Sequence, residues 1–243
     1  PDAGSRLMRE QFVLDAIGEK TTHFSISEPV GMIWHDGNLI AATSFVAGMP
    51  VDLRASQSHL GPPWEIVGRI AAEVHKLPIH DLPKSIERYS TRREQALSTV
   101  NNFRKLNISE IQEAVQWIDK NLPPETDSVL IHGDLLGQNI LWTLEGELFV
   151  IDWEYAFIGD PAYELAIVTR GVKEPFQVSN GLGRLIDSYL SSGGQEISKR
   201  EVQVYELLLC LGWYEQSLDR SNSGHGPDYY LDFLSSLLKR VNK

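Results

Sequence analysis

Two short apolar runs, residues 139–144 and 147–151, constrain the fold of this chain more than any other feature of its sequence. A Glu-Gly pair between them is a turn signal, so the two runs are expected to form an antiparallel hairpin. The hairpin brings Asp152, at the end of the second strand, back beside Asn139, at the start of the first. We therefore expect a carboxylate and an amide to lie side by side in an apolar setting.

A polar loop leads into this hairpin. Residues 130–139 read LIHGDLLGQN, and the run at 129–131 is expected to be a further short strand. Asn139 and Asp152 would offer one amide and one carboxylate oxygen, a hard-cation site of the kind that holds Mg²⁺ when a substrate's phosphates complete the coordination. Asp134, on the loop but outside that pair, is placed to accept the proton of an incoming hydroxyl. Phosphoryl transfer needs little more than such a metal and such a carboxylate.

Each of these residues also has a purely structural explanation. Asp134 could make a turn with its own backbone, Asn139 could cap a strand, and Asp152 could be a buried carboxylate bonded to backbone amides. Another reading is a metal-dependent hydrolase that uses His132, Asp134 and Asp152. It would require further His or Asp ligands near by, and the cluster offers none that convince. The spacing of the residues, with the motifs IDWE and GDP following in order, favours phosphoryl transfer.

The N-terminal part of the chain predicts one helix and one hairpin. Residues 5–17 carry apolar side chains near helical spacing, with Ser5 as the expected N-cap and Gly18 as the stop signal. Two apolar runs then flank the sequence Asp-Gly-Asn at 36–38, which is a strong signal for a β-hairpin.

From about residue 63 the pattern becomes helical. Apolar spacing and the breakers between segments predict helices at 62–77, 85–106, 109–122, 161–170, 181–192, 198–220 and 227–241. Ser109 is the expected N-cap of the third of these helices. The order of helix, hairpin, helices, small β element and more helices gives an α+β fold class. We expect a small N-terminal lobe at 1–48 and a helical lobe at 49–243, joined near 43–50.

Composition narrows the choice of partners. The 33 acidic residues outnumber the 22 basic ones, and no segment carries a cluster of Lys or Arg, so we expect no nucleic-acid partner, whereas a cationic ligand is permitted. Cys210 is the one cysteine of the chain, which excludes an internal disulfide and fits a reducing compartment. No apolar run reaches the ~20 residues of a membrane helix, and no signal-peptide pattern opens the chain. We therefore expect a cytoplasmic protein with no membrane partner.

The pattern H-G-D-x-x-x-x-N at 132–139, followed by I-D-W-E and G-D-P, resembles the signature of the aminoglycoside phosphotransferase and choline kinase family, small-molecule relatives of the protein kinases. The order of helix, hairpin and helical lobe resembles that family too. The resemblance implies a protein-kinase-like, two-lobed fold that uses ATP and Mg²⁺ to phosphorylate a hydroxyl of a small molecule, which can be cationic. It implies that Asp134 is the catalytic aspartate and that Asn139 and Asp152 bind the metal.

Further positions match the family less closely. Glu10 resembles the glutamate of the first helix that pairs with the ATP-binding lysine. Residues 43–46 resemble the hinge that hydrogen-bonds adenine, so Ser44, Phe45 and Val46 are expected to bind the nucleotide. Three residues resemble ones that support the catalytic loop or tie the following helix to it: His132, His75 and Asp160.

Residues that bind the acceptor are harder to choose. Acidic side chains of the helical lobe bind amino groups of cationic acceptors in this family, so the candidates are Glu154, Glu206, Glu215, Asp219 and Asp228. Charged residues on helices, however, usually face solvent. Six aromatic residues fall within apolar helical stripes and are expected in the core rather than around a ligand: Trp64, Trp117, Trp213, Tyr214, Tyr229 and Tyr230.

The same stretch differs from a protein kinase. Gly133 stands where protein kinases carry the arginine of H-R-D, and no A-P-E motif follows. Asp160 follows Asp152 by eight residues, which leaves no room for an activation segment. The acceptor is therefore expected to be a small molecule rather than a protein.

The start of the chain departs from the family pattern. Nine residues precede Glu10 and none of them is lysine, so the N-terminal lobe is expected to be truncated, with the phosphate-covering hairpin and the lysine upstream. The alternative is a non-catalytic, pseudokinase-like or fragment nucleotide-binding module. The intact carboxylates and amide of the loop and hairpin argue against that alternative.

Overall fold

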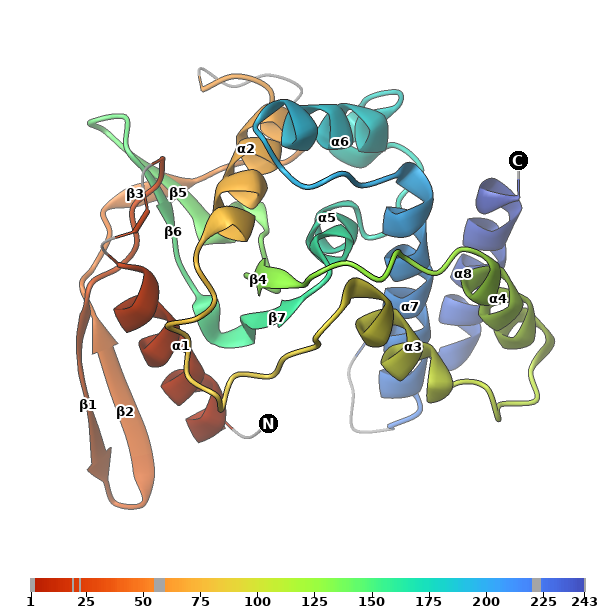
Figure 1. The fold of residues 1–243 in the computed structure, drawn as a ribbon, viewed down its shortest axis with the longest axis horizontal. Helices are drawn as coiled ribbons and strands as arrows, with labels where there is room; N and C mark the ends of the chain where they lie inside the picture. Colours follow the sequence, from red (N-terminus) through yellow and green to blue (C-terminus); the bar gives the residue numbers. More distant parts are fainter. Residues whose placement is uncertain (1–2, 19, 22, 55–59, 220–223, 243) are drawn as a thin grey trace.

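The computed structural model describes residues 3–18, 20–21, 23–54, 60–219 and 224–242, and it combines short strands with a larger helical part (Figure 1). In chain order the elements are α1 (Ala3–Ile17), β1 (Pro29–His35), β2 (Asn38–Thr43), β3 (Gly48–Pro50), α2 (Pro63–Lys76), α3 (Arg92–Asn101), α4 (Ser109–Lys120), β4 (Val129–Ile131), β5 (Ile140–Thr143), β6 (Leu148–Val150), β7 (Phe157–Gly159), α5 (Pro161–Thr169), α6 (Gly181–Ser191), α7 (Lys199–Ser217) and α8 (Pro227–Val241). The expected α+β class is confirmed. No helix in the described ranges is long and apolar enough to cross a membrane.

The N-terminal elements lie together on one side of the molecule, where α1 runs beside the β1–β2 hairpin (Figure 1). The hairpin closes through a two-residue turn, because His35 pairs with Asn38. Asp36 and Gly37 in this turn have φ of 49° and 77°, as the tight turns of hairpins require. The expected hairpin and the helix stop at Gly18 are confirmed.

A three-stranded sheet joins this part to the helices. Its order is β3–β5–β6, with Ile140 of β5 opposite Val150 of β6, as the hairpin prediction requires. The third strand, β3, was not predicted, and it pairs antiparallel with β5 from Gly48 to Pro50. β4 pairs in the same way with β7, which was also not predicted. Both unpredicted strands have three residues, which is too short for a pattern of alternating side chains to be recognised.

The helical part is built around α5, which Figure 1 shows among α2, α6 and α7. α5 begins at a strong local signal, because the side chain of Asp160 accepts a hydrogen bond from the Ala162 N–H at 2.9 Å and Pro161 occupies the first turn. α8 packs against α7, and α4 packs against α8. Nearly all of α5 is buried, so the segment that follows β7 is held rigidly inside this part.

Three expectations about helix ends are wrong. Ser5 lies inside α1 rather than at its cap, and Ser109 is the first residue of α4, which Ile108 precedes as the capping residue. The expected helix at 85–106 is shorter, because α3 begins after Thr91, whose side chain caps it. Before it, Tyr89 donates its backbone N–H to Ile158 at 2.9 Å, so residues before α3 pair with β7 instead of coiling.

Candidate functional site

The loop between β4 and β5 brings Asp134 and Asn139 into direct contact. The Asn139 Nδ2 donates to the backbone carbonyl of Asp134 at 2.8 Å and to its carboxylate Oδ2 at 3.0 Å. The carbonyl oxygen can only accept, so the amide nitrogen must face Asp134. The Oδ1 of Asn139 therefore points elsewhere, and no described residue donates to it.

Asp152 follows β6 after one intervening residue, Ile151, and lies near Asn139. The backbone N–H of Ile151 donates to the Asn139 carbonyl at 3.0 Å, which places the two strand ends next to each other. Asp152 itself has φ of 66° and ψ of 62°, a left-handed conformation that costs about 1–3 kcal/mol for a residue with a side chain. Its carboxylate accepts no hydrogen bond from the described part of the chain. The hairpin thus presents two oxygen ligands for a cation, the Oδ1 of Asn139 and the carboxylate of Asp152. Neither accepts a hydrogen bond from a described residue.

Glu164 of α5 fixes the start of the loop through hydrogen bonds to its backbone. Its carboxylate is fully buried and accepts the backbone N–H groups of His132 at 2.6 Å and Gly133 at 3.2 Å. His75 of α2 lies near the same carboxylate, with its Nε2 3.9 Å from Oε2, while its Nδ1 is 2.9 Å from the Tyr189 hydroxyl. Glu164 of α5 therefore fixes the start of the loop, while the His75 Nε2 lies near its carboxylate without a hydrogen bond.

The His132 ring ties the loop to the hairpin. Its Nε2 lies 2.9 Å from the Ile151 carbonyl, and its Nδ1 accepts the backbone N–H of Asp134 at 3.3 Å. This pattern assigns the proton to Nε2 and leaves the ring neutral. Burial lowers the pKa of His132, which agrees with a neutral ring. The ring also packs on Trp153, with 4.6 Å between the ring centroids, so its contacts are those of a supporting residue.

Gly133 fits a position that no other residue could take without a shift. Its φ is +86°, and a Cβ added there would lie 2.3 Å from the carbonyl oxygen of Tyr155. The loop and the segment after β6 therefore touch through their backbones, which brings Asp134 close to Tyr155.

Burial and mutual repulsion raise the pKa values of the carboxyl groups around this loop. Burial raises the pKa of Asp134, and the hydrogen bond from Asn139 and the charge of Arg170 oppose that rise. Burial also raises the pKa of Asp152, as does the negative charge of Glu154. The pKa of Glu10 is raised by burial and then by Asp152. A cation among these carboxylates would relieve their repulsion.

A pocket of about 620 Å³ opens beside Asp134, between the loop and the helices α5, α7 and α8. Its walls are formed by Gly133, Asp134, Tyr155, Tyr163, Ile167, Arg170, Val172, Leu209, Trp213, Gln216, His225, Tyr229, Tyr230 and Phe233. A carboxylate with an open pocket on one side and two oxygen donors on the other can orient a hydroxyl group toward a metal-bound phosphate.

A family model described as the phosphotransferase enzyme family matches residues 7–197 of this chain. The chain belongs to that family. The matched range includes the loop, the hairpin and α5, whereas the pocket walls from α7 and α8 lie beyond it. This match confirms the resemblance inferred from the motifs. Membership of a family of phosphotransferase enzymes does not favour the alternative of a non-catalytic nucleotide-binding module.

Solved structures of phosphotransferases match nearly the whole chain. An aminoglycoside phosphotransferase matches with a TM-score of 0.69 and 15% identity, over 98% of this chain and 83% of that one. A macrolide 2'-phosphotransferase type I has a TM-score of 0.65 and 17% identity, over 98% and 79% of the two chains. A spectinomycin phosphotransferase in complex with ADP and spectinomycin matches with a TM-score of 0.60 and 15% identity, over 98% of this chain and 81% of that one. These matches confirm the kinase-like fold.

Curated relatives match a shorter stretch at higher identity. Viomycin phosphotransferase of Streptomyces vinaceus is 45% identical over 67 residues, which are 26% of this chain and 22% of that protein. Acyl-CoA dehydrogenase family member 11 of Gallus gallus is 39% identical over 67 residues, 26% of this chain and 9% of that protein. The chain thus matches less than a quarter of the length of either relative.

The acidic residues expected to bind a cationic acceptor do not line this pocket. Glu154 pairs with Arg6 of α1 at 3.3 Å. Glu206 is buried and accepts the Thr169 hydroxyl at 2.6 Å. The other three candidates are exposed and lie outside the wall: Glu215, Asp219 and Asp228. Among the described wall residues, Asp134 is the one carboxylate, so the pocket offers little to attract an amino group.

The residues expected on the nucleotide side lie apart from this pocket. The Glu10 carboxylate accepts the Trp153 N–H at 3.3 Å, beside Asp152, and no described lysine contacts it. In the expected hinge, the Ser44 N–H donates to the Glu28 carbonyl at 2.8 Å and is therefore not free to bind adenine. Phe45 is 92% exposed, and the Val46 carbonyl accepts the Gly48 N–H at 3.1 Å. Asp160 is buried and pairs with Arg92 at 2.8 Å.

The sequence patterns do not identify several residues of the site. Three of the aromatic residues expected in the core, Trp213, Tyr229 and Tyr230, line the pocket instead. Glu164 and Arg170 were also missed. A signal existed for both, because a charged residue within or at the end of the otherwise apolar run PAYELAIVTR requires a partner or a role.

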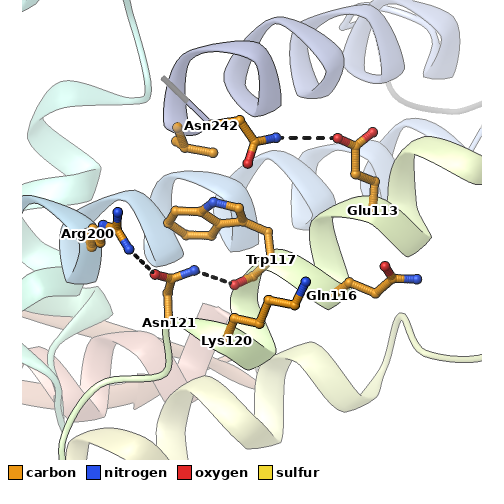
Figure 2. Close-up of a pocket in the computed structure, with 8 residues that line it drawn as sticks. Glu113, Gln116, Trp117, Lys120, Asn121, Arg200 and Asn242 are labelled. Atoms are coloured by element: carbon orange, nitrogen blue, oxygen red, sulfur yellow. Dashed lines mark hydrogen bonds between the residues drawn. The ribbon is translucent and has the colours of Figure 1, made fainter.

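A second pocket, of about 470 Å³, lies where the ends of α4 and α8 meet the start of α7 (Figure 2). Its polar groups bond to one another: Asn121 donates to the Trp117 carbonyl at 2.7 Å, and Arg200 donates to the Asn121 Oδ1 at 3.2 Å. No residue expected at the site lines this pocket, which is therefore separate from the candidate site.

Proposed function

We propose that this protein transfers the γ-phosphoryl group of ATP, with Mg²⁺, to a hydroxyl of a small molecule. Asp134 orients the hydroxyl and takes its proton, while Asn139 and Asp152 hold the metal. The observation that carries the proposal is the double contact of Asp134, which lines the pocket and is hydrogen-bonded to Asn139. One carboxylate thus connects the space for the acceptor with the oxygen donors for the cation.

The donor set of Asn139 and Asp152 fits Mg²⁺. One amide oxygen and one carboxylate, neither with a described protein donor, leave most of an octahedral shell to phosphates and water. Among the described residues no group of three His, Cys, Asp or Glu side chains could hold a metal, so a hydrolase site of several such ligands is not favoured. When bound, the metal would neutralise charge on the phosphates.

The use of a nucleotide is supported by the relatives. One phosphotransferase of the same fold is solved with ADP and spectinomycin, and an aminoglycoside phosphotransferase is solved with AMP-PNP and hygromycin B. We propose that the nucleotide lies between residues 1–48 and 49–243, with Glu10 and the segment Ser44–Val46 on the side of the smaller unit. The acceptor lies in the pocket beside Asp134, and spectinomycin and hygromycin B, which are bound in these relatives, are the first hydroxyl compounds to test.

The test is an ATP-consumption assay with a panel of hydroxyl compounds, applied to wild type and to Asp134→Asn. We expect the variant to lose about 10²–10⁴-fold in kcat while it keeps its affinity for Mg-ATP. Asp187→Asn, an exposed aspartate of α6, is the matched control and should retain full activity. Equal turnover of wild type and Asp134→Asn would refute the assignment.

A second variant separates the metal ligand from the proton acceptor. Asp152→Asn should abolish Mg²⁺-dependent nucleotide binding, measured by titration calorimetry with and without the metal. A variant that binds Mg-ATP as tightly as wild type would exclude Asp152 as a ligand.

A further inference from the structure

Arg170 and Asp134 line the same pocket. Among the described wall residues, Arg170 is the one Arg or Lys, and Asp134 is the one Asp or Glu. The whole chain carries 33 acidic against 22 basic residues, so a cation in this pocket is not explained by the average composition.

The guanidinium of Arg170 has no partner among the described residues. No carboxylate or carbonyl of that part of the chain lies within hydrogen-bond or ion-pair distance of it, and the residue is exposed. Five N–H donors of fixed geometry are thus directed at the pocket or at solvent, and such a group matches a carboxylate or phosphate.

The backbone that carries Arg170 is held in a conformation that a side chain normally avoids. Arg170 has φ of 49°, and Gly171 after it has φ of 65°. A left-handed residue with a side chain costs about 1–2 kcal/mol relative to glycine, so a residue chosen for stability alone would be glycine or asparagine. Arg170 ends α5, at a position where helices commonly have a left-handed residue that is usually glycine, so the unusual feature is the arginine side chain and not the backbone conformation.

Buried contacts on both sides keep Arg170 in place. Before it, the Thr169 hydroxyl donates to the carboxylate of Glu206 at 2.6 Å, and that carboxylate also receives a hydrogen bond from the backbone of Gly171. After it, Arg240 of α8 donates to the Gly171 carbonyl. Glu206 and Arg240 thus fix the turn from α7 and α8, and Arg170 is presented at the pocket wall.

The remaining wall is aromatic and already packed within itself. His225 and Tyr229 stack with 3.9 Å between ring centroids, and Tyr229 meets Tyr230 edge-to-face at 5.2 Å. A cage for an ammonium group needs several open ring faces, and the stack of His225 on Tyr229 takes one face of each of these two rings. A flat apolar body can still pack against such a wall.

We propose that Arg170 binds an anionic group, a carboxylate or a phosphate, on a hydroxyl acceptor with a flat apolar body. The inference rests on the proposed function in one respect, that the compound in this pocket is the phosphoryl acceptor. In this proposal an arginine recognises a negative charge on the acceptor, whereas the sequence predicted that acidic residues recognise an amino group.

The test compares three probes that share a phenyl body and a hydroxyl but differ in charge: 3-phenyllactate, 3-phenyl-1,2-propanediol and phenylalaninol. Binding is measured by saturation-transfer NMR titration, which requires no turnover. We expect wild type to bind phenyllactate about fivefold to tenfold more tightly than the neutral diol, and phenylalaninol most weakly.

The variant Arg170→Asn should lower the affinity for phenyllactate to that of the diol, and leave the diol unchanged. Asparagine accepts the left-handed backbone, so the fold is kept, and circular dichroism checks this. Lys173→Gln, an exposed lysine outside the pocket wall, removes the same charge and should behave as wild type. An Arg170→Asn variant with an unchanged ratio of the two affinities would overturn the proposal, as would tightest binding of phenylalaninol or no binding of any probe up to its solubility limit.

Two further arms separate this proposal from others. If Arg170→Asn weakens binding of ADP with inorganic phosphate but not of phenyllactate, the arginine serves the transferred phosphoryl group and the proposal is wrong. If the charge preference holds while no hydroxyl compound is phosphorylated, the recognition by Arg170 stands and the proposed phosphoryl transfer fails.

Discussion

The buried carboxylate of Glu164 accepts the backbone N–H of His132 at 2.6 Å, and so α5 determines where the loop with Asp134 begins. It also accepts the N–H of Gly133 at 3.2 Å. The position of Asp134 in this protein therefore depends on a residue that touches neither the pocket nor the expected metal ligands.

Replacement of Glu164 by leucine should both destabilise the protein and misplace Asp134. Two buried N–H groups would lose their acceptor, which costs about 2–5 kcal/mol in the free energy of unfolding. Glu164→Gln keeps one acceptor oxygen and should lie between leucine and wild type. Urea unfolding gives the free energies, and Glu174→Leu, at an exposed position after α5, should change them by about 0.5 kcal/mol or less. A Glu164→Leu variant as stable as this control would show that the loop is held by other contacts.

Gly133 and Gly146 allow the effect of crowding to be separated from the effect of backbone conformation. Both have φ of +86°, but a Cβ at Gly133 would lie 2.3 Å from the Tyr155 carbonyl oxygen, whereas nothing lies within 4 Å of one at Gly146. Alanine at either position should cost about 1–2 kcal/mol because of the positive φ. Gly133→Ala should cost at least about 2 kcal/mol more, because backbone must move.

The activity of the same two variants provides the functional comparison. Gly133→Ala shifts the residue before Asp134, so kcat should fall at least about tenfold, while Gly146→Ala should keep wild-type kcat because it lies in the turn of the β5–β6 hairpin. Equal stability and equal kcat for the two variants would contradict the close approach of loop and Tyr155.

The parts of the site that could be predicted from the sequence are local. Asp134 and Asn139 are five residues apart, and a short hairpin brings Asp152 to them, so the strand pattern is enough to place all three. Glu164 acts through hydrogen bonds to a distant segment, and Arg170 lines a pocket that distant helices form. The apolar run around the two residues indicates that each needs a partner or a role, but it does not indicate which segments they meet.

The same limit explains the error at residues 85–91. Their composition permits a helix, but the backbone of Tyr89 bonds to Ile158 of β7, and tertiary pairing prevails over a weak local preference. Similarly, Trp213 and Tyr229 have the spacing of core residues, yet they line a pocket, because an aromatic stripe has the same pattern in both cases.

The buried pair of Arg92 and Asp160 should be the most sensitive ion pair in the helical part. Arg92 is 2% exposed, its Nε lies 2.8 Å from Asp160 Oδ1, and its Nη2 lies 2.6 Å from Glu201 Oε1. Arg92→Met leaves the Asp160 carboxylate buried without its cation and should cost about 3–5 kcal/mol.

The neighbouring Arg93 is the matched control for this pair. It is 3.5 Å from Glu125, but both side chains are substantially exposed, so Arg93→Met should cost about 1 kcal/mol or less. Thermal unfolding of the two variants, followed by circular dichroism, measures the contrast. Similar losses for both variants would mean that burial of the pair contributes nothing to its effect.

Glu206 should make the stability of this protein fall as pH rises. Burial raises the pKa of its carboxyl, and the hydrogen bond from Thr169 and the charges of Arg240 and Lys199 oppose that rise without cancelling it. Between the ordinary value of 4.5 and the raised one, the folded state keeps a proton that the unfolded state has lost. The folded state then binds more protons, so the free energy of unfolding decreases with pH across this window.

The variant Glu206→Gln tests this sign, because glutamine resembles the protonated carboxyl at every pH and still offers an oxygen to the Thr169 hydroxyl. Its free energy of unfolding, measured in urea at several pH values between about 4 and 8, should lack the decrease seen in wild type. The difference between variant and wild type should thus grow in the variant's favour as pH rises through the window, and stay constant above it. Glu215→Gln, an exposed residue of the same helix, should follow wild type. Parallel curves for wild type and Glu206→Gln would mean that Glu206 has the same pKa in the folded and unfolded states, and that its burial among Thr169, Gly171 and Arg240 is fully compensated.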